Sequence, residues 1–311
     1  MPSFKSRLLL FALRYRRLFT PKKQRLDWID RDTDITALRE MVESGAGFFG
    51  KLPPGFTLEA DKIGDLAVEW MLPPGAARDR VILYLHGGGL VVGSIRAHRG
   101  VVSKFVKGSG IPALVIEYSL APEKPYPAGL NDTLAAYRYL LDQGIAPERI
   151  VFMGDSGGGN LCLASLLAIK DKHLPLPAAA VALSPWTDLT NSGESREFND
   201  SRDLLSWRNS DVIFSEYYAT DHDPKHPWIS PLFGDLSGLP PIRLYAGGHE
   251  LMLSDSTRFA DKAQAAGSDV TVTVGEGLFH CYPACAPLFP EATRALEEIC
   301  GFIREKTGAE A

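Results

Sequence analysis

The chain has 311 residues, which is enough for one large domain or two medium ones, and its 45% hydrophobic and 23% charged residues are typical of a folded globular protein. A formal net charge of −5 argues against a nucleic-acid-binding protein, because no overall positive field would attract phosphates. The cysteines show no CxxC pair or zinc-ligand spacing, which favours free thiols in the cytoplasm; they are Cys162, Cys281, Cys285 and Cys300.

The N-terminal segment carries eight Lys or Arg residues and no acidic residue before Asp27. Its apolar core, residues 8–13, is too short for a signal peptide or a membrane span, so no integral membrane segment is predicted. Two roles stay open for the basic helix: docking on the protein's own core, which we favour, and peripheral contact with a membrane. The helix is predicted from apolar residues at helical spacing, with arginines on the other faces: Leu8, Phe11, Ala12, Tyr15, Leu18 and Phe19, and Arg7, Arg14, Arg16 and Arg17.

Strands and helices alternate along most of the remaining chain. The pattern predicts strands at 81–85, 113–120, 149–154, 178–185, 241–247 and 269–275, and helices at 131–144, 158–171, 255–267 and about 288–306. Because the strands are nearly continuous apolar runs, we expect an α/β fold with a mostly parallel central sheet and helices on both faces.

One segment, residues 186–235, breaks this alternation. It contains Trp186, Trp207 and Trp228, many charges and no convincing strand. Fifty residues are too long for a plain connection, so we expect a helical cap over the C-terminal edge of the sheet. The whole chain, 1–311, is predicted to form a single domain whose cap consists of about residues 1–45 and 186–235.

A glycine-rich turn joins the strand at 149–154 to the following helix. Its sequence, Gly154-Asp155-Ser156-Gly157-Gly158, has the G-x-S-x-G pattern and the strand–turn–helix context of a nucleophile elbow. A phosphate-binding loop is excluded, because that loop needs a lysine and none occurs here before Lys170. A purely structural turn remains the alternative for Ser156.

A serine nucleophile needs a base and an acid, which in this fold follow it in the order acid, then histidine. His280 comes just after the last predicted strand, where the base is expected. For the acid we favour Glu250, three residues after the strand at 241–247, over Asp255. Asp255 lies at the start of the next helix, where a capping role would explain it.

A second glycine cluster, His86-Gly87-Gly88-Gly89, follows the strand at 81–85. Its backbone N–H groups would be free to approach an oxyanion, so Gly88, Gly89 and Gly157 are the predicted oxyanion hole. A dinucleotide fingerprint is the weaker interpretation, because Val92 occupies the position of its last glycine.

Six blocks in order make the sequence resemble the hormone-sensitive-lipase-like (family IV) esterases of the α/β-hydrolase superfamily: HGGG (86–89), YSLAPE (118–123), GDSGGGN (154–160), SPWTDLT (184–190), SPLFGDLSGLPP (230–241) and GGHELMLSDS (247–256). The resemblance implies a carboxylic ester hydrolase without metal or organic cofactor that acts on short- to medium-chain esters, and a homodimer is a family expectation. Three positions depart from the family pattern, namely Leu90, Ser119 and Gly157.

The expected function is therefore hydrolysis of a small-molecule ester by a Ser156–His280–Glu250 triad. A lactone or amide hydrolase with the same triad stays open, as does a non-catalytic ligand-binding protein on the same fold.

Overall fold

The computed structural model of the chain describes residues 2–15, 29–45, 52–205 and 209–309. Five residues used in the sequence predictions lie outside the described residues: Arg16, Arg17, Leu18, Phe19 and Trp207.

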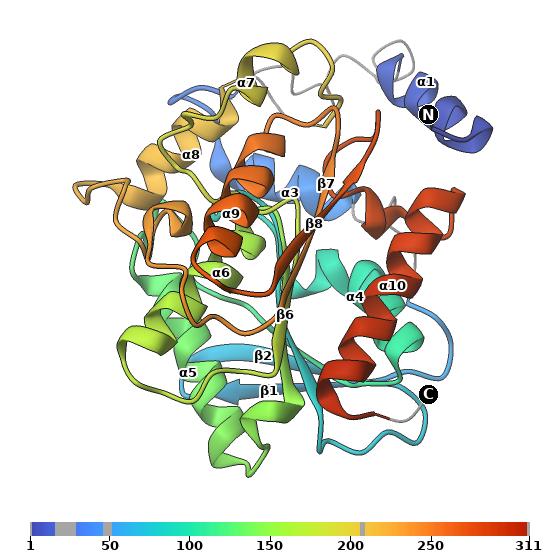
Figure 1. Cartoon of the computed structure of the whole chain (residues 1–311), viewed down its shortest axis with the longest axis vertical. Helices are drawn as coiled ribbons and strands as arrows, with labels where there is room; N and C mark the ends of the chain where they lie inside the picture. The colour runs from blue at the N-terminus through green and yellow to red at the C-terminus, as the bar shows by residue number, and fades with distance from the viewer. Residues whose placement is uncertain (1, 16–28, 46–51, 206–208, 310–311) are drawn as a thin grey trace.

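A single eight-stranded sheet forms the centre of the molecule (Figure 1). Its order is β1-β2-β4-β3-β5-β6-β7-β8; β1 pairs with β2, and β2 with β4, in antiparallel fashion, and the other pairs are parallel. The strands are β1 (Thr57–Ile63), β2 (Leu66–Leu72), β3 (Val81–Leu85), β4 (Ala113–Ile116), β5 (Ile150–Asp155), β6 (Ala179–Leu183), β7 (Ile242–Gly247) and β8 (Val270–Gly275).

The six predicted strands are confirmed, although the strand expected at 113–120 ends at Ile116. Two strands, β1 and β2, were not predicted. β1 is an edge strand whose residues are mostly exposed, and its charged sequence, TLEADKI, lacks the apolar alternation that signals a strand.

Helices cover both faces of the sheet, as predicted. They are α1 (Phe4–Arg14), α3 (Ile35–Gly45), α4 (Ile95–Ser109), α5 (Ala128–Asp142), α6 (Gly157–Asp171), α7 (Ser195–Phe198), α8 (Ser210–Ala219), α9 (Leu253–Ala265) and α10 (Pro290–Thr307). Figure 1 shows α4 and α10 on one side of the sheet and α5, α6 and α9 on the other. The side chains of β3 alternate between the two cores that result, with Leu83 in one and Tyr84 in the other.

Helix α4 was not predicted, although its ends carry ordinary signals. The Ser94 hydroxyl accepts a hydrogen bond from the Ala97 N–H (3.0 Å), and Gly110 ends the helix with a φ of 73°. The helix follows the glycine-rich HGGG turn after residues 90–94 and packs against α10, β2 and β4.

Residues 29–45 and the segment 186–235 meet at helix α8. The Arg31 guanidinium pairs with the Glu216 carboxylate of α8 at 2.7 Å. Arg39 of α3 donates to the carbonyl oxygens of Val91 (2.9 Å) and Ala121 (3.0 Å), which lie just after the HGGG turn and after β4. These contacts place both segments beside the carboxyl-terminal ends of the parallel strands.

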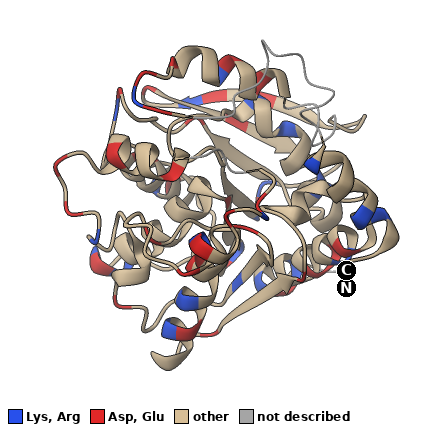
Figure 2. Ribbon diagram, turned by 90° about the horizontal axis from the view of Figure 1, so that it is seen from above, with Lys and Arg blue, Asp and Glu red and all other residues tan. Residues whose placement is uncertain are grey.

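Acidic and basic residues are interspersed over the described chain (Figure 2). Within the described residues, no helix is both long and apolar enough to cross a membrane.

Candidate active site

Ser156 lies between the end of β5 and the start of α6, as the elbow pattern predicts. Its φ of 55° and ψ of −119° are strained for a residue with a side chain, and such strain is typical of functional turns. Helix and strand approach closely here, because a Cβ on Gly158 would lie 2.0 Å from the carbonyl oxygen of Leu85. Ser156 therefore lies on a sharp turn at the carboxyl-terminal end of β5, a strand inside the sheet.

Glu250 and His280 come together although they follow different strands. The His280 Nδ1 donates to Glu250 Oε2 at 3.2 Å, and the glutamate side chain is fully buried. The Ser184 hydroxyl donates to the same oxygen at 2.6 Å and accepts from the Cys281 N–H at 2.8 Å. Ser184 thus fixes the carboxylate and the backbone next to the imidazole at the same time, a role that was not predicted.

Burial of the His280 ring lowers its pKa, whereas the neighbouring Cys281 sulfur and the Glu250 carboxylate raise it. The balance holds the pKa of His280 well above 6.5. A carboxylate that accepts from Nδ1–H favours the tautomer of the neutral ring in which Nε2 carries no proton and can accept one.

Asp255, the alternative acid, lies elsewhere. Its carboxylate accepts from the Asp188 N–H at 2.9 Å, and its other oxygen lies 3.6 Å from Arg196 Nη2. The expected capping role for Asp255 is wrong, because α9 begins at Leu253 without a side-chain cap. Asp255 instead ties α9 to the segment that follows β6.

One carbonyl group links Ser156 to the loop of His280. The oxygen of Leu183, at the end of β6, accepts from the Ser156 N–H at 2.8 Å and from the Cys281 thiol at 3.5 Å. Over the described residues, no hydrogen bond joins the Ser156 hydroxyl to His280. Ser156 and the Glu250–His280 pair are therefore neighbours that no hydrogen bond connects. In active sites such hydrogen bonds commonly tighten only when substrate binds.

The HGGG turn lies against the elbow. Gly88 and Gly89 have φ angles of 125° and 61°, which side chains rarely adopt. A Cβ on Gly157 would lie 2.9 Å from the Gly89 nitrogen and 2.8 Å from the Leu90 nitrogen. The three predicted oxyanion glycines are therefore in one place, with the backbone of Gly157 in contact with that of the turn.

Asp155, the residue before Ser156, holds the HGGG turn through its carboxylate. Its Oδ1 accepts from the Tyr84 hydroxyl (2.8 Å) and from the Gly87 N–H (3.0 Å), and its Oδ2 lies 3.6 Å from His98 Nε2. Burial raises the pKa of Asp155, but His98 and Tyr84 outweigh it and lower the pKa. Sequence reasoning placed Asp155 in the elbow motif but assigned it no role.

His86 is buried beside this group and stays neutral, because burial and the nearby His98 lower its pKa to about 3. Its Nδ1 lies 2.9 Å from the Gly87 oxygen, and the Tyr118 hydroxyl donates to its carbonyl oxygen at 2.7 Å. The ring stacks on Tyr118 at 4.2 Å between centroids. The start of the HGGG turn is therefore fixed by side chain and backbone together.

The segment 186–235 reaches the site at two points. The Asn199 side-chain amide donates to the carbonyl oxygens of Gly248 and Glu250, each at 3.0 Å, and so holds the loop after β7 that contains Glu250. Phe214 of α8 covers the HGGG turn, because a Cβ on Gly89 would lie 2.4 Å from its ring.

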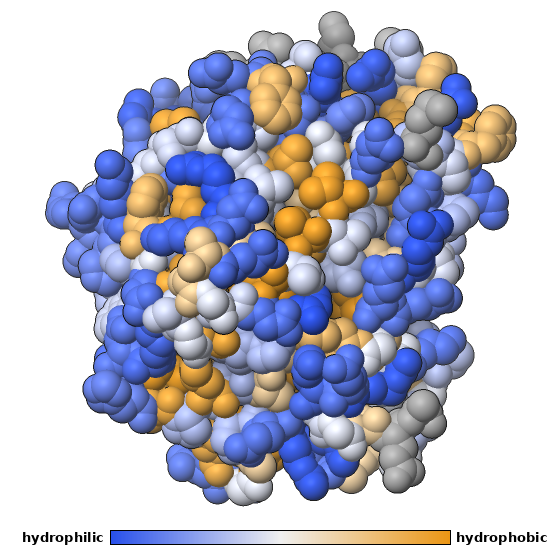
Figure 3. Space-filling model, viewed as in Figure 1, coloured by the Kyte–Doolittle hydropathy of each residue, from blue (hydrophilic) through white to orange (hydrophobic). Residues whose placement is uncertain are grey.

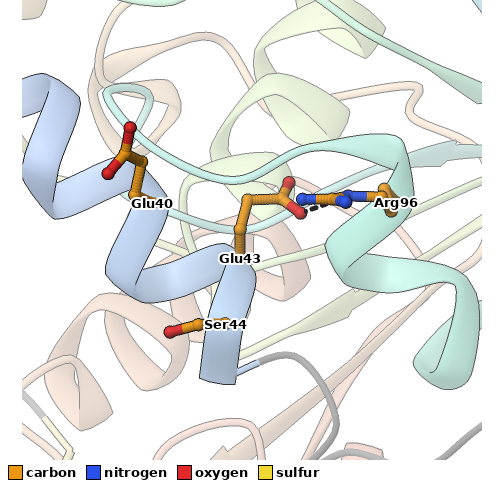
Figure 4. A pocket seen from close by; sticks show the side chains of 4 residues that line it. All are labelled: Glu40, Glu43, Ser44 and Arg96. Atoms are coloured by element: carbon orange, nitrogen blue, oxygen red, sulfur yellow. Dashed lines mark hydrogen bonds and ion pairs between the residues drawn. The ribbon is translucent and has the colours of Figure 1, made fainter.

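A surface pocket between α3 and α4 contains none of the predicted site residues (Figure 4). It is lined by Glu40, Glu43, Ser44 and Arg96. Glu43 pairs with Arg96 at 2.7 Å and so links α3 to α4.

Known proteins resemble the chain in sequence and in fold. A family model described as the alpha/beta hydrolase fold matches residues 82–284. An acetyl-hydrolase of Streptomyces hygroscopicus is 37% identical over 286 residues, covering 91% of this chain and 94% of that protein. An esterase of Acinetobacter venetianus is 36% identical over 228 residues, covering 73% of this chain and 75% of that protein.

A crystal structure of an esterase from the bacterial hormone-sensitive lipase family aligns with 99% of this chain and all of its own, with a TM-score of 0.89 and 36% identity. Fold, relatives and site define the protein as a carboxylic ester hydrolase. The chain belongs to the α/β-hydrolase fold family, in its hormone-sensitive-lipase-like branch.

Proposed function

We propose that Ser156 is the nucleophile of this esterase, His280 its general base and Glu250 the acid that orients the base. The observation that carries the proposal is the 3.2 Å contact between His280 Nδ1 and buried Glu250 Oε2, beside the strained elbow of Ser156. His280 Nε2 takes the proton of the Ser156 hydroxyl as it attacks the ester carbonyl, and Glu250 balances the imidazolium charge.

The negative charge of the tetrahedral intermediate then falls on an oxygen bound by the amides of Gly88, Gly89 and Gly157. The N-terminus of α6 stabilises the same negative charge, because helix N-termini carry a partial positive charge. His280 protonates the departing alcohol, and water activated by the same base attacks the acyl-enzyme and releases the acid.

The substrates proposed are short- to medium-chain esters. Phe214 lies against Gly89 and is almost fully buried, so its ring limits the space next to the reacting carbonyl. The name of the acetyl-hydrolase relative points in the same direction, although it describes that protein only.

We further propose that residues 186–235 and the N-terminal segment form a cap on a single domain, supported by the Arg31–Glu216 ion pair and the Asn199 contacts. A cytoplasmic location is supported by the four free, buried cysteines. A homodimer would use the edge of β8, whose Val274 is exposed; light scattering of the purified protein tests it.

The central experiment combines labelling with hydrolysis. A fluorophosphonate probe should modify Ser156 in the folded protein, as mapped by mass spectrometry, and Ser156→Ala should abolish both labelling and hydrolysis of p-nitrophenyl butyrate. A series from p-nitrophenyl acetate to p-nitrophenyl dodecanoate then measures the acyl preference. Full hydrolysis by the Ser156→Ala protein would refute the proposed nucleophile.

A further inference from the structure

One face of α1 is docked on the body of the protein. The hydroxyls of Ser3 and Ser6 donate to Glu291 Oε2 at the start of α10, at 2.9 and 2.7 Å. Burial would raise the pKa of Glu291, but these hydrogen bonds hold it at about 2. Three leucines of the same face, Leu9, Leu10 and Leu13, pack on the core beneath α10. The orientation of the helix is thereby fixed.

The opposite face of α1 is apolar and exposed. Phe4, Leu8, Phe11 and Tyr15 recur every three or four residues, so they form one stripe along the helix, and they are 79, 60, 62 and 42% exposed. Of the eight large apolar side chains that are strongly exposed in the described residues, half lie on this stripe. Apolar side chains gather at the edge of the molecule where α1 lies (Figure 3), and such a concentration marks a binding surface.

Basic side chains flank the stripe on both sides. On a helix with 3.6 residues per turn, Lys5 falls on one flank and Arg7 and Arg14 on the other, and all three are exposed. Helix α1 contains no acidic residue, although the whole chain has a formal net charge of −5. The charged residues of α1 itself are therefore all positive, although the net charge of the whole chain is negative.

The apolar stripe and its basic flanks limit what can bind to the outer face of α1. A second copy of the chain would bring two sets of like charges together around a shared apolar contact, which is unfavourable. A membrane surface with anionic headgroups meets both demands, because aromatic and aliphatic side chains enter the headgroup–acyl boundary while Lys and Arg reach the phosphates.

We propose that the outer face of α1 binds the surface of anionic phospholipid membranes. The stripe of Phe4, Leu8, Phe11 and Tyr15 enters the interface, and the flanking cations pair with lipid phosphates. With 11 residues the helix lies in the plane of the membrane and does not cross it. This interaction is independent of the proposed ester hydrolysis.

Docking of α1 also decides which part of the protein faces the lipid. Pro2 lies against Gly277, in the loop that leads from β8 to His280, because a Cβ on Gly277 would lie 2.9 Å from the Pro2 ring. A membrane bound to α1 is therefore beside the edge of the sheet that carries His280.

The test is co-sedimentation of the full chain with vesicles. We expect binding to vesicles of equal parts phosphatidylcholine and phosphatidylglycerol, weaker binding to pure phosphatidylcholine, and loss of binding as salt rises. The variant F4S/L8S/F11S should lower the apparent affinity for the mixed vesicles by about tenfold or more. K5E/R7E/R14E should lose the preference for anionic lipid.

Two matched variants serve as controls. F198S/V212S removes two exposed apolar side chains on α7 and α8, and K62E/K107E/R138E reverses three exposed charges elsewhere; both should bind vesicles like the parent protein. Circular dichroism and hydrolysis of p-nitrophenyl acetate without vesicles check that each variant is folded. Failure of the parent protein to bind either vesicle, or unchanged binding by F4S/L8S/F11S, overturns the proposal. The proposal is also overturned if the parent protein forms a dimer that F4S/L8S/F11S alone dissociates, while this variant still binds vesicles like the parent protein.

Discussion

The Gly87 N–H donates to Asp155 Oδ1 at 3.0 Å, so the HGGG turn is tied to the residue immediately before Ser156. The Tyr84 hydroxyl donates to the same oxygen at 2.8 Å. Oxyanion stabilisation depends on donors that are already in place when charge develops. We therefore expect the half-buried Asp155 carboxylate to set the position of the proposed oxyanion donors relative to the proposed nucleophile.

Asp155→Ala is expected to lower kcat by about 10²- to 10³-fold with a smaller effect on KM, because the turn that carries two of the proposed oxyanion donors loses its anchor. It should also lower the free energy of unfolding by about 1–3 kcal/mol for each buried donor left unpaired, here Tyr84 and Gly87. Steady-state kinetics and urea unfolding measure the two effects.

Asp155→Asn is the control, since it keeps an oxygen acceptor for Tyr84 and Gly87 and loses only the charge that faces His98. It should retain most of the activity that Asp155→Ala loses. Equal kcat values for the parent protein and Asp155→Ala would show that the turn holds its place without Asp155.

Glu250→Gln tests the acid through the pH profile. The base works only as neutral imidazole, so kcat/KM falls as pH drops through the pKa of His280, and that pKa is raised well above 6.5. Removing the carboxylate charge lowers the pKa, so the acid limb should move to lower pH. At the plateau, kcat should fall by about 10²- to 10⁴-fold, because the imidazolium is no longer balanced.

Asp255→Asn is the matched control for this experiment, because Asp255 is also a buried carboxyl group but contacts Arg196 and the Asp188 N–H rather than His280. It should leave the midpoint of the acid limb unchanged. If Asp255→Asn shifted the limb and Glu250→Gln did not, the choice of acid would be reversed.

The sequence was sufficient for the mostly parallel sheet, since its buried strands are continuous apolar runs, and for the elbow, since G-x-S-x-G between a strand and a helix is a local pattern. Glu250 and His280 could be placed because each follows a strand at a short distance. The supporting contacts could not be foreseen, because Ser184, Asp155 and Asn199 act through partners far away in the chain. Their residue types are common in loops and carry no signal of their own.

Ser184→Ala should weaken the site without removing any group proposed to react. The hydroxyl bridges Glu250 Oε2 and the Cys281 N–H, so its loss leaves that N–H without its partner and frees the carboxylate to move. We expect a fall in kcat of about tenfold and a loss of about 1–3 kcal/mol in the free energy of unfolding. Equal kcat values for the parent protein and Ser184→Ala would argue against the bridge.

Phe214→Ala should broaden the acyl preference. The ring lies against Gly89, so its removal opens space beside the reacting carbonyl, and the ratio of kcat/KM for p-nitrophenyl octanoate to that for the acetate should rise about tenfold. Truncating a buried phenylalanine costs about 3–5 kcal/mol, so activity is measured well below the midpoint of thermal unfolding. An unchanged ratio would place the acyl pocket elsewhere.

Asp255 should make stability depend on pH between about 4 and 7. Burial raises its pKa from 3.8 to about 7, although Arg196 opposes the shift. Because the folded protein binds this proton more tightly than the unfolded chain, the stabilisation is complete below the unfolded pKa and is lost as pH rises toward 7. The loss amounts to about 1.4 kcal/mol for each unit of difference between the two pKa values.

Urea unfolding of the parent protein and Asp255→Asn across this range provides the measurement. The asparagine variant does not titrate, so the stability of the parent protein relative to it should fall steadily from pH 4 to pH 7. Asp261→Asn, at an exposed position of the same helix, should run parallel to the parent protein. A constant difference between the parent protein and Asp255→Asn would mean that Arg196 keeps the carboxylate ionised throughout, and that the charged pair joins α7 to α9 at every pH.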